Sequence, residues 1–432
     1  MKKIAFSLVL LFYLVNAVGQ TTAEEVHELL KAYSSVKAFN GSALVAQHGK
    51  ILISEGFGFK NISLKTPNDS GSIFRIGTLT KPITASMVLQ MQEAGQISVD
   101  NKLSIYIPDF PIADSISLKD LLDNRSGLRP YPEFNYSGQS AIDSLIAFIK
   151  NYPLNFKPGT EFENSNTNYL LLGYIIQQVG GKPFYQTIRE KIFKSREMTH
   201  SGFDYQSLSS GGKTTGYLNL NSKTIKPAPI LDSGILYSEG GLYSNTSDLY
   251  KWVLGFFSGR DLSSFLNDHY DLGWIIDSAY AKKTFLQESL IPGFSGFMAW
   301  IPHDSTCIIL LENRNSGDLL QIAENINAIL NKQPYDFPVP RAEIEVDQAI
   351  LKGYTGLYRM GEKLKLKIEL DEDQLYVEAL GLGRSVLFAE QENYFYTKVS
   401  NIEIEFIKNA EGKVNRLILH QKGETIEGYR IE

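Results

Sequence analysis

Apolar and polar residues recur along the chain in patterns that predict a protein of mixed α and β structure. Residues 24–36 (EEVHELLKAYSSV) carry apolar residues at helical spacing, which predicts a helix. In residues 41–59 two apolar runs flank Gly49, and residues 296–313 show a similar pattern, so each stretch predicts a β-hairpin. Strands near both ends of an otherwise helical region predict one sheet built from distant parts of the chain.

Three further helices are predicted from apolar periodicity and from the glycines or polar residues that end them. The stretch ITASMVLQMQEAG (83–95) has apolar residues at four-residue steps on one face and ends at a glycine. Pro82 lacks an N–H and is tolerated only in the first helical turn, so this helix is expected to begin near Thr78 or Leu79. The other two helices are expected at residues 167–181 and 318–332.

A change of pattern after residue 332 predicts a second domain over residues 342–432. Residues 333–341 (QPYDFPVPR) contain three prolines in nine residues and are expected to form a linker. Residues 363–370 (KLKLKIEL) alternate strictly between polar and apolar, as a half-buried strand does. Together with other short strands, this predicts a small all-β sandwich or barrel. The other strands are expected at residues 374–380, 385–389, 394–398, 402–407 and 414–420.

The N-terminus has the pattern of an export signal over residues 1–20. Lys2 and Lys3 precede an apolar run over residues 4–15, and small residues follow it. The run has 12 residues, which is short for a membrane span, although a membrane anchor is the alternative interpretation. We therefore expect a periplasmic or secreted protein without a stable membrane anchor.

Composition narrows the chemistry further. The chain has 43% hydrophobic residues and a net charge of −6, which fits a folded protein and gives no electrostatic reason to expect a nucleic-acid partner. Cys307, the only cysteine, lies within the apolar stretch CIILL, so a buried thiol is expected and an intramolecular disulfide is excluded. No two of the six histidines have metal-ligand spacing, and no metal or cofactor is expected.

One short stretch, IGTLTKPITA (76–85), could carry chemistry. Thr78 and Lys81 are three residues apart, so on a helix the lysine amine lies on the same face as the hydroxyl. An amine with a lowered pKa can take the proton of an alcohol and make it a nucleophile, and N–H groups at a helix N-terminus can bind an oxyanion. Taken alone, the spacing favours an ordinary helix start, with Thr78 as the cap and Lys81 in solvent.

The surroundings of this stretch point to a family. Residues 74–111 resemble the nucleophile region of the serine β-lactamase and penicillin-binding-protein-like hydrolases, in the class C β-lactamase, DD-peptidase and esterase branch. The resemblance spans about residues 40–332 and implies an α+β fold over 21–332, with a β-lactamase-like mixed sheet flanked by helices and a large helical region. The C-terminal β domain resembles a small domain often appended to these hydrolases. Further landmarks occur in family order at residues 116–128, 159–176, 239–252 and 291–302.

The resemblance assigns roles to particular residues. It puts the serine of the family's Ser-x-x-Lys motif at Thr78 and its lysine at Lys81. The second motif, usually Tyr-x-Asn, corresponds to residues 164–166, where Asn166 would hold a substrate amide and Asn164 replaces the tyrosine. A carboxamide cannot act as a general base at neutral pH, so this departure removes a proton path. A helix cap is the alternative role for Asn166.

The third motif, Lys-Thr-Gly or His-x-Gly, falls at Gln287-Glu288-Ser289 when residues are counted back from IPGF without a gap. Gln287 would then replace the cation or imidazole, and Ser289 the glycine. Glu288 would put a negative charge where the family usually favours anionic substrates. A shifted alignment on residues 283–285 (Lys-Thr-Phe) needs a gap and still lacks the glycine.

Two interpretations follow. In the first, favoured by departures in all three motifs, the family reaction is weakened or lost. The protein then binds a small-molecule or peptide- or ester-like ligand in its cleft and acts as a binding or regulatory protein of the cell envelope. In the second it is an active hydrolase or acyltransferase with Thr78 as nucleophile, Lys81 as base and Asn166 orienting the substrate. Backbone N–H groups near Thr78 and the 291–299 strand would hold the oxyanion in that case.

Overall fold

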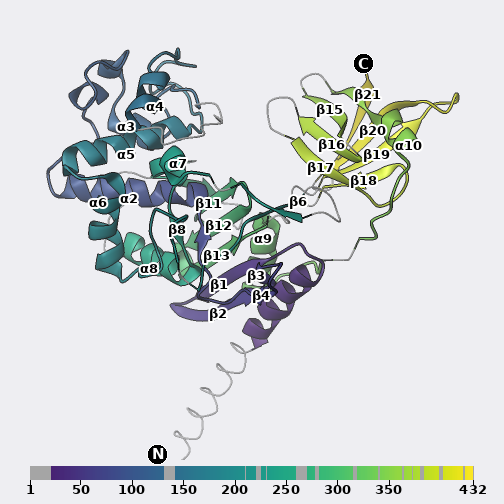
Figure 1. Ribbon diagram of the computed structural model, residues 1–432, viewed down its shortest axis with the longest axis horizontal. Helices are drawn as coiled ribbons and strands as arrows, with labels where there is room; N and C mark the ends of the chain where they lie inside the picture. The colour runs from purple at the N-terminus through teal and green to yellow at the C-terminus, as the bar shows by residue number, and fades with distance from the viewer. Residues whose placement is uncertain are drawn as a thin grey trace, which may run out of the picture.

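The main domain combines one central sheet with many helices, and a β-barrel stands beside it (Figure 1). This computed structural model describes residues 21–130, 142–209, 211–219, 225–229, 231–258, 270–277, 282–314, 319–338, 341–361, 364–371, 373–379, 384–397, 402–421 and 424–431. The predicted export signal, residues 1–20, lies outside them.

The central sheet is built from both ends of the main domain, as the strand pattern predicted. Its order is β2-β1-β13-β12-β11-β10-β9, and neighbouring strands pair antiparallel. Both expected hairpins are confirmed, and the first turns through His48 and Gly49, whose φ angles are 53° and 73°. The strands are β1 (Gly41–Gln47), β2 (Lys50–Phe57), β9 (Tyr270–Asp271), β10 (Trp274–Asp277), β11 (Thr284–Ile291), β12 (Phe294–Ile301) and β13 (Thr306–Glu312).

Helices cover both faces of the sheet, and alternate residues of each central strand serve the two faces. Val45 and Leu310 belong to the core under the helix at residues 21–35 and α9. Leu44 and Leu311 belong to the larger core on the other face, with α2, α5 and α8. Because both faces are covered, all seven residues of β13 are buried and the strand reads as a continuous apolar run.

Cys307 lies on β13 and is fully buried. Burial in apolar surroundings raises the pKa of its thiol well above the ordinary value, so the thiol stays protonated. The expected buried, unreactive cysteine is confirmed.

The helices follow the predicted order. A single 3₁₀ turn, η1 (Gly77–Leu79), leads directly into α2, so the expected start near Thr78 or Leu79 is confirmed and Pro82 lies in the first turn of α2. Helix α5 ends at a glycine in the left-handed region, Gly181 (φ 62°). The α-helices are α2 (Thr80–Glu93), α3 (Leu118–Leu122), α4 (Ile142–Ile149), α5 (Asn166–Gly180), α6 (Phe184–Ile188), α7 (Ser233–Gly240), α8 (Thr246–Phe257), α9 (Leu319–Leu330) and α10 (Gln348–Tyr354).

Short strand pairs and helical turns complete the main domain. The strand pairs are β3 (Phe59–Asn61) with β4 (Thr66–Pro67), β5 (Phe74–Arg75) with β8 (Tyr243–Ser244), and β6 (Tyr217–Asn219) with β7 (Ile225–Pro227). The turns are η2 (Leu103–Ile105), η3 (Ala113–Ser115), the π-helical η4 (Arg189–Phe193), η5 (Lys194–Arg196) and η6 (Pro302–Asp304).

The C-terminal all-β domain is a closed barrel, which decides between the two predicted architectures. Its strands run in chain order from β14 to β21, and β21 pairs back with β14 to close it. All the predicted strands are present, and two more, β14 and β21, were not predicted. The strands are β14 (Gly356–Met360), β15 (Leu364–Asp371), β16 (Gln374–Ala379), β17 (Arg384–Ala389), β18 (Tyr394–Tyr396), β19 (Ile402–Lys408), β20 (Val414–Gln421) and β21 (Glu424–Arg430).

The end of the predicted linker is attached to the barrel through Arg341. Its guanidinium lies over the ring of Tyr396, 4.7 Å from the centroid, and forms ion pairs with Glu403 and, at 3.5 Å, with Glu390. A planar guanidinium suits this combination of stacking and ion pairing. The chain is therefore fixed to the barrel several residues before α10.

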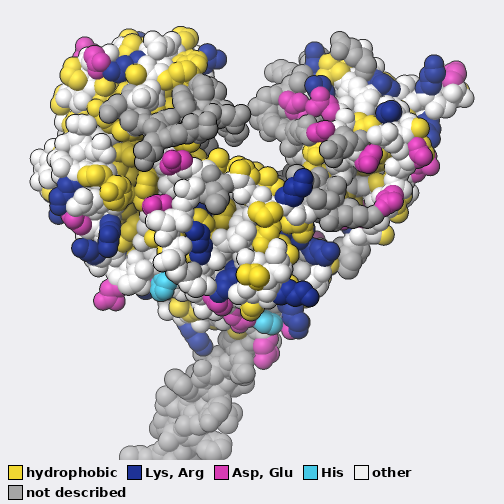
Figure 2. Space-filling model, in the orientation of Figure 1, with side chains coloured by type: hydrophobic (Ala, Val, Ile, Leu, Met, Phe, Trp, Pro, Cys, Tyr) yellow, Lys and Arg dark blue, Asp and Glu magenta, His cyan; other side chains and the backbone are white. Residues whose placement is uncertain are grey.

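Two further observations concern membrane-spanning helices and metal-binding clusters. Within the described ranges, no helix is long and apolar enough to cross a membrane. The same ranges contain no group of three or more histidine, cysteine, aspartate or glutamate side chains suited to a metal ion. On the face drawn in Figure 2, the described Lys and Arg side chains intermingle with Asp and Glu.

Candidate active site

Thr78 lies in η1, between β5 and α2, and is tied to strand β11. Its hydroxyl donates to the main-chain carbonyl of Glu288 at 2.7 Å, and its N–H donates to Ser289 Oγ at 3.0 Å. A longer contact, 3.5 Å, joins Gln287 Nε2 to the Thr78 carbonyl. Strand β10 pairs with β11 only as far as Leu286, so the later edge of β11 is available for these bonds.

The third motif therefore lies against Thr78 in the ungapped alignment. Gln287 and Ser289 are both buried, at 4% and 7% exposure, and alternate along β11 so that both side chains reach η1. The alternative residue Lys283 is exposed, with its amine 5.6 Å from the ring centroid of Phe285. The backbone groups beside Thr78 come mainly from β11, whereas the sequence had suggested the following strand at 291–299.

Lys81 is the second residue of α2 and is almost completely buried, with 1% exposure. Its amine donates to Asn164 Oδ1 at 2.9 Å and lies 5.5 Å from the ring centroid of Tyr169. Burial lowers the pKa of Lys81 from 10.5 to about 8, and the nearby Glu239 carboxylate opposes that effect. Near neutral pH a useful fraction of the amine is uncharged and able to accept a proton.

The two asparagines of the second motif have different positions. Asn164 is exposed and occupies the place beside Lys81 that the resemblance gives to a tyrosine. Asn166 is the first residue of α5 and is half-buried, while Ser165 is the N-cap residue. The alternative interpretation of Asn166 as the helix cap is therefore wrong.

Asn124, which was not singled out from the sequence, holds the second motif in place. Its Oδ1 accepts from Asn168 Nδ2 at 2.7 Å and from the Ser165 N–H at 3.3 Å. Its Nδ2 lies 3.5 Å from Asn164 Oδ1. The residue is fully buried with φ 55°, a left-handed conformation that asparagine tolerates better than most residues. The sequence signal was its position in the 116–128 landmark.

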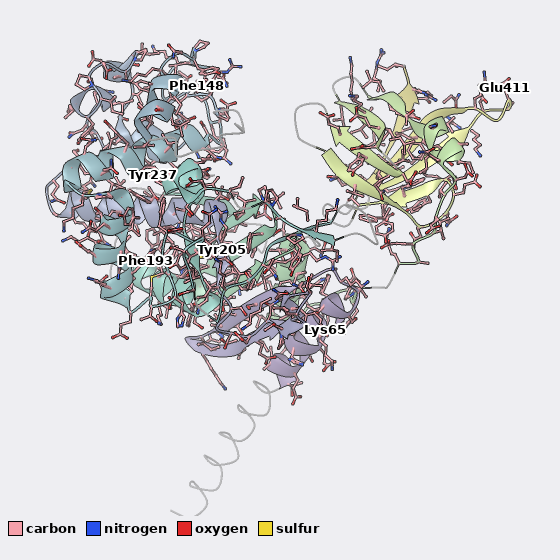
Figure 3. All side chains as sticks on the ribbon, in the orientation of Figure 1. Lys65, Phe148, Phe193, Tyr205, Tyr237 and Glu411 are labelled. Carbon is pink, nitrogen blue, oxygen red and sulfur yellow. The ribbon has the colours of Figure 1, made fainter. Side chains whose placement is uncertain are left out.

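Glu239 is the second functional candidate that the sequence did not identify. It is 2% exposed, lies on α7, and acts electrostatically on Lys81. The helix is interrupted two residues earlier at Tyr237, whose φ and ψ are 38° and −124°. Tyr237 is labelled in Figure 3 beside the helical part of the domain. Only the 239–252 stretch as a whole had been noted as a landmark, so nothing marked this carboxylate as a neighbour of Lys81.

The arrangement brings together a hydroxyl, an amine with a lowered pKa, and main-chain N–H groups. These are components of nucleophilic acyl transfer. However, the Thr78 hydroxyl donates to a carbonyl of β11, and the Lys81 amine donates to Asn164. Each group that the reaction would use is thus engaged in another hydrogen bond.

A large open cavity, of about 1510 Å³, lies elsewhere in the main domain. It is bordered by Tyr185, Arg189, Phe203 and Tyr243, among others, and none of its lining residues is one of the predicted site residues. The hydrogen-bonded cluster around Thr78 and Lys81 is therefore a separate feature.

Comparisons with known proteins identify the family of the chain. The sequence model of the Beta-lactamase family matches residues 29–330, and that of a domain of unknown function, DUF3471, matches residues 340–430. PbpX of Bacillus subtilis (strain 168), whose name places it among penicillin-binding proteins, is 29% identical over 335 residues, covering 73% of this chain and 84% of the relative. A second penicillin-binding protein of that strain is 26% identical and covers 96% of this chain and 100% of its own.

Solved structures show the same fold. A penicillin-binding protein homologue from Pyrococcus abyssi, described as octameric, superposes with a TM-score of 0.63 and 22% identity, covering 94% of this chain and 99% of that one. A D-amino acid amidase from Ochrobactrum anthropi SV3 has a TM-score of 0.65 and 18% identity, covering 72% and 99%. Identities this low are evidence of fold alone. Since the family model covers most of the main domain, the chain belongs to the Beta-lactamase family of penicillin-binding-protein-like serine hydrolases, whose chemistry is acyl transfer.

Proposed function

We propose that this protein is an exported member of the family that binds a peptide- or ester-like ligand at the Thr78 site and catalyses acyl transfer weakly or not at all. The observation that carries the proposal is the hydrogen bond from the Thr78 hydroxyl to the Glu288 carbonyl, at 2.7 Å. A hydroxyl that donates to a carbonyl oxygen has its proton directed away from any base, so it is not activated as a nucleophile.

The other departures act in the same direction. The methyl group of Thr78 restricts χ1 and crowds the approach to a carbonyl carbon. A misplacement of about 1 Å can reduce a rate by roughly 100-fold. Asn164 holds the Lys81 amine at 2.9 Å but cannot relay a proton as a phenol can.

The chemistry of β11 favours a ligand without a carboxylate at this position. Gln287 offers a neutral carboxamide, and its Oε1 is buried without a hydrogen-bond partner among the described residues. The acidic Glu288 follows it on the exposed side of the strand. Gln287, Glu288 and Ser289 themselves supply no cation to pair with a carboxylate, and Glu288 adds a negative charge, whereas an amide or ester needs no such partner.

The second candidate function is active hydrolysis or acyl transfer, and the lowered pKa of Lys81, about 8, favours it. Thr78 Oγ1 would form a bond to the substrate carbonyl carbon while its proton passes to the Lys81 amine. That proton would then go to the departing alcohol or amine as its bond to the carbonyl breaks. Asn166 would orient the substrate, and water would release the acyl group from Thr78.

One experiment tests the proposal against this alternative. The mature protein is incubated with a fluorescent penicillin, a fluorophosphonate and chromogenic esters, and intact mass is followed over time. Thr78→Ala and Thr78→Ser are compared with the parent. Thr355→Ala serves as a matched control, because that hydroxyl also donates to a main-chain carbonyl but lies in the β-barrel domain.

The proposal predicts little or no adduct formation and turnover in the parent, with a ligand still detected by a thermal shift. Activity that appears only in Thr78→Ser would identify the nucleophile as the main defect and support the proposal. Rapid adduct formation or turnover that is present in the parent and Thr355→Ala and disappears in Thr78→Ala would refute it in favour of the active enzyme.

A further inference from the structure

The hydroxyl of Ser289 is bound to the main-chain N–H of Thr78. Ser289 Oγ accepts the main-chain N–H of Thr78 at 3.0 Å. In acyl transfer, main-chain N–H groups beside the nucleophile bind the carbonyl oxygen of the substrate and stabilise its negative charge. The N–H at the nucleophile position of this chain is instead already bound to a side chain.

The backbone of β11 places a second main-chain N–H on the same side as Thr78. The Glu288 carbonyl points to Thr78, and in a strand the N–H two residues later points to the same edge. The N–H of Leu290 therefore lies on the side of β11 where the Thr78 N–H is found. Two main-chain donors close together commonly bind an oxyanion, and the Ser289 hydroxyl already occupies one of them, the Thr78 N–H.

The space around the hydroxyl is closely filled. A Cβ added to Gly77 would lie 2.2 Å from Ser289 Oγ and 3.0 Å from Ile291 Cγ2. Ser289 is also 7% exposed, so solvent does not surround its hydroxyl. A carbonyl oxygen that binds the Thr78 N–H would have to displace the Ser289 oxygen or share that hydrogen with it.

We propose that Ser289 determines whether this site accepts a carbonyl group, because its hydroxyl occupies the place of the substrate's carbonyl oxygen. The inference rests on the proposed function in one respect, since the site must be able to receive a carbonyl compound. It adds a specific cause to the weak acyl transfer that is independent of the Thr78 methyl and of Asn164. The family motif has glycine at this position, which has no side chain to fill the space.

The expected change in the acylation rate can be estimated from the contribution of one oxyanion-binding N–H group. Losing one such donor reduces a rate by roughly 100-fold or more in enzymes that use it. Removing the Ser289 hydroxyl frees the Thr78 N–H without adding a new group. Because the Thr78 methyl and Asn164 still limit the reaction, the rate of acylation should rise by less than this full amount, by about 10- to 100-fold.

The test uses the full chain and 4-nitrophenyl acetate as the probe. Acetyl transfer forms a bond from Thr78 Oγ1 to the acetyl carbon, breaks the bond to 4-nitrophenolate, and passes the hydroxyl proton to Lys81. Ser289→Gly and Ser289→Ala remove the hydroxyl, and Ser289→Thr retains it as the conservative variant. Intact mass gives the rate of adduct formation, and Thr78→Ala combined with Ser289→Gly reports any acetylation at other residues.

The expected result is an increase of about 10- to 100-fold in both Ser289→Gly and Ser289→Ala, no increase in Ser289→Thr, and loss of the adduct with Thr78→Ala. Ser289→Ala keeps a Cβ in the strand, so it serves where the glycine variant is unstable. Parent-like rates in a folded Ser289→Ala protein would overturn the inference. An equal increase in Ser289→Thr would also overturn it, since the hydroxyl would then not be the obstacle.

The two proposals fail in different ways in this experiment. A parent protein that reacts rapidly at Thr78 refutes the proposed function, and the ratio of Ser289→Ala to parent still decides the role of Ser289. A parent that is inert, with equally inert Ser289→Gly and Ser289→Ala variants, refutes the role of Ser289 and leaves the proposed function intact.

Discussion

Replacing Lys81 by methionine should change the pH dependence of stability in a defined way. Lys81 is 1% exposed, and burial lowers its pKa from 10.5 to about 8. The difference between these two values corresponds to about 3 kcal/mol of unfavourable free energy for holding the charged amine in the folded protein. Lys81→Met removes this cost and loses a hydrogen bond to Asn164 that contributes about 1 kcal/mol.

The sign of the pH effect follows from proton binding. Because the folded-state pKa of Lys81 lies below its unfolded value, the unfolded chain binds more protons between about pH 8 and pH 10.5. The parent protein therefore gains stability as the pH rises through this window. Lys81→Met lacks this gain, so its stability relative to the parent should be constant below about pH 7 and should fall by about 3 kcal/mol on approaching pH 10.5.

The assay is urea unfolding followed by tryptophan fluorescence from pH 6 to pH 10.5. All three tryptophans of the chain, Trp252, Trp274 and Trp300, are buried in the main domain, so the signal reports that domain and not the barrel. Lys50→Met, at an exposed residue of β2, is the matched control and should follow the pH dependence of the parent. A stability difference between Lys81→Met and the parent that stays constant from pH 7 to pH 10.5 would refute the reasoning.

Four other substitutions test separate features. Gly77→Ala should cost at least about 2 kcal/mol, because φ is 47° and the new Cβ would clash with a hydroxyl of β11. Gly95→Ala, at φ 67° in open space, should cost only about 1 kcal/mol in the same urea assay. Asn164→Asp should raise the pKa of Lys81 above about 8, because it adds an opposite charge, as measured by NMR titration of lysine labelled with ¹³C at Cε. Arg341→Met should speed chymotrypsin cleavage of the linker, because it removes the ion pairs to the barrel, while unfolding of the main domain is unchanged.

Local pattern was sufficient for most of the fold. The hairpin at residues 41–59 and helix α2 have their periodicity and their turn or stop residues in one short stretch. Strands β14 and β21 were missed because neither alternates strictly, and six of the seven residues of β21 are exposed. Each strand forms a hairpin with its neighbour in sequence, but their pairing with each other joins parts of the chain about seventy residues apart, which no local window contains.

The site could be predicted as a set of positions but not as a set of bonds. Thr78, Lys81, Asn164 and Ser289 were each found from the resemblance, yet the partner of each group depends on atoms from distant segments. The bond from Lys81 to Asn164 spans 83 residues of sequence, and the bond from Thr78 to Ser289 spans 211. Glu239 had no local signal at all, because its significance comes only from its burial close to Lys81.

The three departures from the family motifs have a common effect: each gives a hydrogen-bond partner to a group of the site. A working acyl-transfer site keeps donors and a base ready for a ligand, and unsatisfied buried groups of this kind cost stability when no ligand is bound. Here Ser289 accepts the Thr78 N–H, the Glu288 carbonyl accepts its hydroxyl, and Asn164 accepts from Lys81. The bonds at Thr78 engage its N–H and its hydroxyl proton, both of which the reaction uses, and the bond at Lys81 holds the amine on a side chain that cannot relay a proton. We infer that restoring one motif alone gives only part of the activity, because the other two groups stay engaged. The combined Thr78→Ser and Ser289→Gly variant should therefore gain more activity than either change alone and should be less stable than the parent in the urea assay.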